Sequence, residues 1–164
     1  MKPAAQSIEA RLKAALTAGV VAGLVDIVAA SMINHAPPAR ILQSIASGVL
    51  GMAAYSGGGG AIALGLLLQI LMSIVIASVY ALPTRRLPWL VSRPLAAGLA
   101  FGVGVFVVMN LVVVPLSAFA PKPKHVTLAF LSLNLAAMLV FGVLVATLAR
   151  WSLRRAGDAD LVGG

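Results

Sequence analysis

The sequence predicts an all-α fold: a four-helix transmembrane bundle with a short extra interfacial or re-entrant helix between the first and second spans. Composition is the first observation, since 61% of the 164 residues are hydrophobic and only 10% are charged. A soluble domain carries roughly 25% charged residues. The second observation is a set of four apolar windows, each about as long as a helix that crosses the hydrocarbon of a bilayer. Nothing resembles the short alternating strands of a transmembrane barrel, so the windows predict helices.

The four windows define the predicted spans in chain order. They cover residues 14–33, 61–82, 95–114 and 128–149. The first window is longer than the apolar region of a secretory signal peptide and contains Asp26, so it is predicted to be a retained span. We expect one integral membrane domain over residues 1–156 and a flexible cytoplasmic tail over residues 157–164.

The distribution of basic residues predicts the orientation of the spans. Nine of the 12 Lys and Arg residues lie in the N-terminal segment, the 83–94 loop and the C-terminal segment. The remaining three, Arg40, Lys122 and Lys124, lie in the other two connections. Basic loops stay in the cytoplasm, so both termini are predicted to be cytoplasmic. The same clusters explain the net charge of +8 through topology and contact with lipid headgroups, and no nucleic-acid partner is predicted.

The connection from residue 34 to residue 60 is long and largely apolar, and it predicts the extra helix. Pro37 and Pro38 end the first span and can begin a new helix. The pattern over residues 39–54 is helical, and a helix of about 14 residues would extend only about 21 Å, short of the ~30 Å hydrocarbon core. The helix is therefore predicted to lie along the outer interface or to dip in and return.

Polar residues of this helix define candidate sites with two interpretations each. Gln43, Ser44 and Ser47 form a polar stripe that could face the bundle as a lid or face water. Arg40 lies in the first turn, where the helix dipole favours anions, and could bind an anion or a lipid headgroup. The simpler interpretation of Arg40 is a side chain that extends to the headgroup region.

Each span carries one strongly polar residue, and these predict a common layer. They are Asp26, Gln69, Asn110 and Asn134. At about 1.5 Å per residue, all four lie in the outer half of the membrane, within roughly one helical turn of each other. Ser73 follows Gln69 on the small-residue face of the second span. The layer is either a structural set of interhelical hydrogen bonds or the floor of an outward-facing pocket for a ligand or ion.

Asp26 itself also has two interpretations. It is either a proton- or cation-linked site or a neutral carboxyl that is hydrogen-bonded between helices. The pairs Gly19/Gly23 and Gly98/Gly102 form GxxxG motifs, which let helices approach closely. These faces could pack the bundle itself, build a homo-oligomer or contact a larger membrane complex. Membrane lipids are the other predicted partners.

The chain offers little for chemical catalysis. It has no cysteine, no phosphate-binding loop, no HExxH motif and no paired carboxylates. Its two histidines, His35 and His125, lie in the outer connections without a carboxylate or thiol nearby, which is a poor metal site. No catalytic residue, no metal and no cofactor is predicted.

A resemblance to a known family comes from three stretches of sequence. These are "PPARILQSIASGVLG" with the Gly-rich link after it, "ALGLLLQ" and "MNLVVVPLSA". They resemble a family of small uncharacterised bacterial four-span inner-membrane proteins that share an LQSIASG run and a closing PLSA, over roughly residues 20–120. The resemblance implies a location in the bacterial inner (cytoplasmic) membrane. It implies no biochemical activity, and the family has His where this chain has Gln69.

These observations together predict a non-enzymatic integral membrane protein with an outward-facing polar pocket. The pocket would bind or pass a small solute, a proton or a lipid headgroup. Two alternatives stay open: an accessory subunit of a larger membrane complex, and an intramembrane enzyme that acts on lipid.

Overall fold

The structure, a computed structural model, describes residues 8–116 and 127–162, with side chains as far as Ala156. Within these ranges every regular element is helical and no strand occurs. Four helical segments are long and apolar enough to cross a membrane, namely Ile8–Ile33, Gly58–Arg85, Pro94–Leu116 and Leu128–Ala156. The predicted all-α class and the four predicted spans are therefore confirmed.

Within residues 8–116 the elements follow one another with short connections. The first half of the chain holds α1 (Ile8–Ile33), α2 (Pro38–Leu50), the 3₁₀-helix η1 (Gly51–Tyr55), α3 (Gly58–Ala81) and the 3₁₀-helix η2 (Leu82–Arg85). The second half holds α4 (Trp89–Ser92), α5 (Pro94–Val108), the π-helix η3 (Met109–Val113), α6 (Val114–Leu116) and α7 (Leu128–Val162). Helix α7 thus includes residues 157–162 of the predicted tail, whose flexibility stays a prediction.

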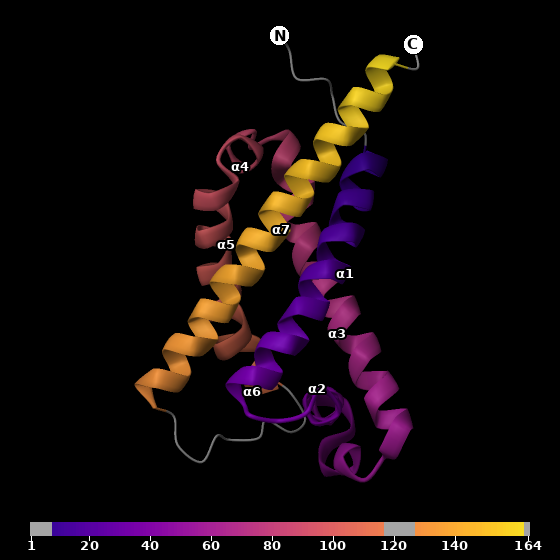
Figure 1. Ribbon diagram of the computed structural model, residues 1–164, viewed down its shortest axis with the longest axis vertical. Helices are drawn as coiled ribbons and strands as arrows, with labels where there is room; N and C mark the ends of the chain where they lie inside the picture. Colours follow the sequence, from indigo (N-terminus) through magenta and orange to yellow (C-terminus); the bar gives the residue numbers. More distant parts are fainter. Residues whose placement is uncertain (1–7, 117–126, 163–164) are drawn as a thin grey trace.

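The spans pack in the order α3, α1, α7, α5, because α1 contacts both α3 and α7 while α5 packs mainly on α7. The start of α1 and the end of α7 lie at the same end of the bundle as α4 (Figure 1). We call this the α4 end. Helix α2 lies at the opposite end, which we call the α2 end. Because the number of spans is even, both ends of the described chain lie on the same side, as the sequence predicts.

Glycines allow the closest helix contacts. A Cβ atom on Gly19 of α1 would lie 2.6 Å from the Cα atom of Ile74 on α3. A Cβ atom on Gly98 of α5 would lie 2.7 Å from the Cα atom of Val143 on α7. Gly23 and Gly102 face the same two neighbours, α3 and α7. Both GxxxG pairs therefore pack the bundle itself, the first of the alternatives for these faces.

Helix α2 and η1 correspond to the predicted extra helix between the first two spans, which is confirmed. Figure 1 shows α2 almost end-on, so its axis runs across the spans rather than along them. Leu42 and Ala46 are buried. A Cβ atom on Gly65 of α3 would fall on the backbone carbonyl of Leu42, so the absence of a side chain at Gly65 lets α2 rest on α3.

We expect the substitution Gly65→Val to lift α2 away from α3. Overpacking of a close contact costs about 1–3 kcal/mol, which corresponds to about fivefold or more in the local opening equilibrium. Hydrogen-exchange mass spectrometry should show faster exchange across residues 38–55. Gly60→Val is the matched control, because a Cβ atom there meets nothing within 4 Å. Equal exchange in the two variants would contradict the close contact.

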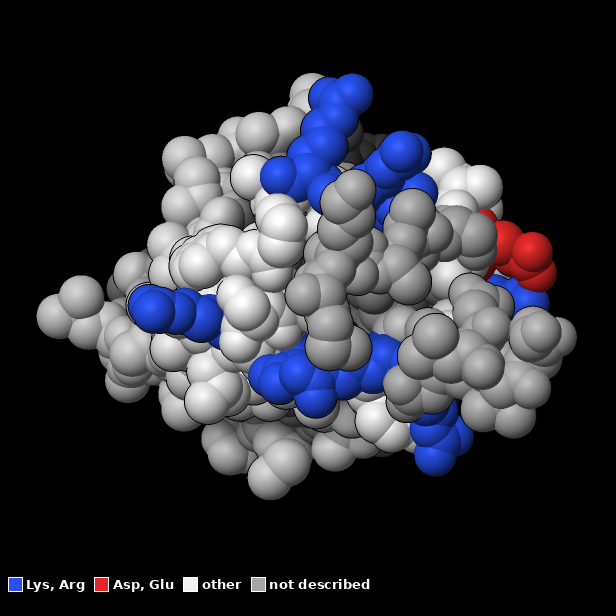
Figure 2. All heavy atoms as spheres, turned by 90° about the horizontal axis from the view of Figure 1, so that it is seen from above, with Lys and Arg blue, Asp and Glu red and all other residues white. Residues whose placement is uncertain are grey.

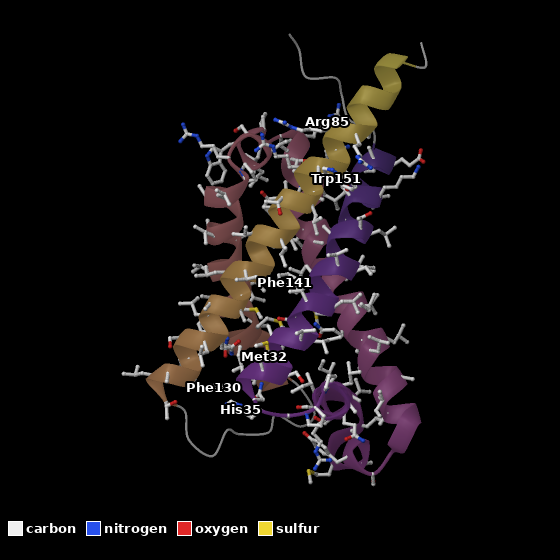
Figure 3. All side chains as sticks on the ribbon, viewed as in Figure 1. Met32, His35, Arg85, Phe130, Phe141 and Trp151 are labelled. Carbon is white, nitrogen blue, oxygen red and sulfur yellow. The ribbon has the colours of Figure 1, made fainter. Side chains whose placement is uncertain are left out.

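Basic side chains gather at the α4 end. Figure 2 looks at this end and shows several Lys and Arg side chains around it. The described members are Arg11, Lys13, Arg85, Arg86, Arg93, Arg150, Arg154 and Arg155. Trp151 lies at the same end (Figure 3), and the guanidinium of Arg155 lies 4.0 Å from the centre of its ring. Among the described basic residues Arg40 alone belongs to the α2 end, which is the asymmetry that the orientation rule uses.

Candidate functional site

A small cavity lies inside the bundle and has walls from all four spans. The centre of a water molecule can occupy about 30 Å³ of it, and one water needs about 10–15 Å³. The cavity therefore has room for roughly two waters or one small ion. Met72, one of its lining residues, is 38% exposed, so this wall of the cavity lies at the surface of the bundle.

Asp26 and Gln69 form the polar wall of this cavity. The side-chain amide of Gln69 on α3 donates a hydrogen bond to the Asp26 carboxyl on α1, with Nε2 and Oδ2 separated by 2.9 Å. The same nitrogen lies 3.3 Å from the backbone carbonyl oxygen of Gly23, which it also contacts as a donor. The structure thus brings together two of the four residues that the sequence places in one layer.

Ser73 completes the polar side of the cavity. It lies one helical turn after Gln69 on α3, lines the cavity and is only 2% exposed. A Cβ atom on Gly23 would lie 2.6 Å from the Ser73 hydroxyl oxygen. The glycine therefore lets α1 and α3 approach closely enough for the carboxyl, the amide and the hydroxyl to share one space.

Apolar side chains close the cavity toward the α4 end. Ile76, Val105 and Phe141 line this part, and Phe141 lies about halfway along α7 (Figure 3). Beyond them the rings of Tyr80 on α3 and Phe101 on α5 meet edge to face, with centroids 5.1 Å apart. Toward the α2 end α3 and α5 diverge (Figure 1). The polar wall is thus separated from the α4 end by two apolar layers.

The remaining two residues of the predicted polar layer do not line the cavity. Asn110 lies in the π-helix η3, and its side-chain amide donates to the backbone oxygen of Phe106 in its own span at 2.8 Å. Asn134 is half-buried on α7, one turn before Met138, which does line the cavity. Asp26 and Gln69 thus share a wall of the cavity, while a common layer of all four residues stays a prediction.

The polar stripe of α2 is also separate from the cavity. Ser47 is fully buried, and its hydroxyl donates to the backbone oxygen of Ser44 at 2.6 Å. Gln43 accepts a hydrogen bond from the exposed Arg40 guanidinium at 3.4 Å. Neither Gln43, Ser44 nor Ser47 lines the cavity. Arg40 lies 4.9 Å from the centre of the Tyr55 ring, and its anion-binding role stays a prediction.

Of the two histidines, only His35 belongs to the described residues, and it does not line the cavity. His35 is exposed in the turn after α1, with a positive φ of 49°, and it lies near the α2 end (Figure 3). His125, Lys122 and Lys124 lie outside the described residues. In the described part of the chain no three His, Cys, Asp or Glu side chains gather into a metal-binding group.

Sequence reasoning missed the three methionines that line the cavity, Met72, Met109 and Met138. A thioether scores as apolar in any hydropathy count, so these residues look like ordinary membrane-facing positions. The π-helix that begins at Met109 was missed as well, because it replaces one turn inside a predicted span and leaves the hydropathy of that span unchanged.

Four apolar helical spans define the class of the chain: an integral membrane protein with a transmembrane helix bundle. No family model matches the chain, and no curated protein or solved structure is found to be similar to it. The resemblance drawn from the LQSIASG and PLSA stretches therefore stays a prediction.

Proposed function

We propose that this protein is a non-enzymatic membrane protein whose cavity binds or passes a small solute or a proton. One observation carries the proposal. The Asp26 carboxyl lies within a span, is hydrogen-bonded to Gln69, and faces a space large enough for water or an ion. A charged residue at this depth costs about 2.5–3.5 kcal/mol on insertion scales and usually faces protein or a water-filled cavity. A purely structural carboxyl would need only the hydrogen bond and no free space beside it.

The proposal includes an orientation. The excess of Lys and Arg at the α4 end supports a cytoplasmic position for that end in a bacterial inner membrane. The apolar layers around Phe141 and Tyr80 then lie on the cytoplasmic side of the cavity, and the polar wall lies on their outer side. In this state a solute would enter from the outside and would need a rearrangement of those layers to pass through.

Flux into proteoliposomes tests the function. We expect vesicles with the wild-type protein to pass protons, reported by an enclosed pH-sensitive dye, or small solutes, reported by light scattering, faster than empty vesicles. Gln69→Leu should lower the flux about tenfold, because the lost hydrogen bond to the carboxyl is worth about 1.5 kcal/mol.

Asn110→Leu is the matched control for this experiment. It removes a carboxamide from another span, but one that donates to a carbonyl of its own span and does not line the cavity. Its flux should equal that of the wild type. Wild-type flux no faster than that of empty vesicles, or an equal loss in both variants, would overturn the transport role.

A further inference from the structure

The sulfur atoms of the chain are concentrated at the cavity. Three of the six methionines line it, and each comes from a different segment: Met72 from α3, Met109 from the π-helix and Met138 from α7. Two of the others are strongly exposed, Met32 at 72% and Met52 at 64%. Since Asp26 belongs to α1, all four spans place a side chain with an oxygen or sulfur donor at one small space.

The π-helix contributes directly to this arrangement. Met109 is its first residue. A π-turn holds more residues than an α-turn, shifts the side chains that follow around the axis, and occurs frequently at functional sites. Here Asn110 is directed to the carbonyl of Phe106, while Met109 lines the cavity.

We infer that the cavity is a binding site for a soft monovalent metal cation, Cu(I), with the thioethers of Met72, Met109 and Met138 as ligands and Asp26 as the counter-charge. This inference rests on the proposed function and names its substrate class. Thioether sulfur is a soft donor that favours Cu(I), whereas hard cations such as Mg²⁺ and Ca²⁺ require oxygen donors.

The charges at the site also match a monovalent cation. Thioethers are neutral, so three of them leave the single positive charge of the ion uncompensated. The ionised carboxyl of Asp26 neutralises that charge, and burial of a charge away from water is costly unless it is paired. A divalent cation at the same place would retain one unpaired positive charge.

Silver ion is the probe for this site, because Ag(I) has the same charge and ligand preference and does not change oxidation state in air. We expect the purified protein in mild detergent to retain one Ag(I) per chain after desalting, measured by elemental mass spectrometry. Met109→Leu and Met138→Leu should each weaken the affinity more than about tenfold, since even a group outside the ligand shell of a metal changes affinity by 10–100-fold. Leucine is close to methionine in volume, so the fold should be kept.

The exposed methionines supply the matched controls. Met32→Leu and Met52→Leu remove the same sulfur from places outside the cavity, and silver binding should not change. Equal effects of the cavity and control variants, or silver binding that survives Met109→Leu and Met138→Leu together, would overturn the inference. Methionine would then serve at the cavity as an adaptable apolar residue.

The silver experiment and the flux experiment can fail separately. Flux that depends on Gln69 without any silver binding would overturn the cation assignment and keep the proposed function. Silver binding that depends on the three methionines without flux of any kind would support the site and overturn the transport role.

Discussion

Gly142→Leu is expected to destabilise the bundle more than any other single substitution considered for this chain. A Cβ atom on Gly142 of α7 would lie 2.7 Å from the backbone nitrogen of Gly102 on α5, and closer still to the carbonyl of Gly98. Both neighbours are backbone atoms and cannot rotate away, so the helices must separate. Overpacking typically costs 1–3 kcal/mol and occasionally more. We expect about 3 kcal/mol or a failure to fold, measured by SDS titration of the protein in mixed micelles.

Gly104→Leu is the control for that experiment. Gly104 lies on α5, two residues after Gly102, but a Cβ atom there meets nothing within 4 Å. Its unfolding midpoint should stay close to that of the wild type. Equal midpoints for the two variants would mean that α5 and α7 do not cross at backbone contact.

Asp26→Asn should remove the flux while it keeps the fold. Asparagine has nearly the same shape as aspartate, and its side-chain oxygen can still accept the hydrogen bond from Gln69. The variant cannot carry a negative charge or exchange a proton at that oxygen. If a proton or a cation interacts with the carboxyl during passage, the flux in proteoliposomes should fall to the level of empty vesicles.

The SDS titration of the same preparation serves as the folding control for Asp26→Asn. An unchanged midpoint with no flux would assign the loss to the charge rather than to the structure. Unchanged flux would contradict the proton- or cation-linked role and would leave only a neutral solute for the cavity. Since the cation site depends on the same charge, Asp26→Asn should also weaken Ag(I) binding.

Much of the fold could be predicted from the sequence because a bilayer imposes strong conditions. Only a helix of about 20 apolar residues satisfies its backbone across the hydrocarbon, so the four windows define the four spans. The Pro37–Pro38 pair and the short helical pattern after it predict α2 for the same reason: the segment is apolar but too short to cross. Helix ends were less predictable, since α1 and α7 continue beyond their apolar windows.

The candidate site was predictable only in part, because depth and direction are separate properties. Counting residues places Asp26, Gln69, Asn110 and Asn134 at similar heights. Successive residues point about 100° apart around a helix axis. An error of one residue in the predicted contact between two helices therefore places a side chain on the wrong face. The π-turn at Met109 adds a further rotation in the third span. Asn110 therefore faces its own helix, and a methionine takes the position at the cavity.

The length of α7 has a practical consequence for imaging this protein. The helix has 35 residues, or about 52 Å at 1.5 Å per residue, so it exceeds the ~30 Å hydrocarbon core. Its last turns stand beyond the other spans at the α4 end (Figure 1). A rigid scaffold protein fused in helical register after Ala156, before the predicted flexible tail, would move with the bundle as one body. It would supply the particle mass and asymmetry that electron cryomicroscopy needs for so small a membrane protein, and would leave the α2 end free for ligands.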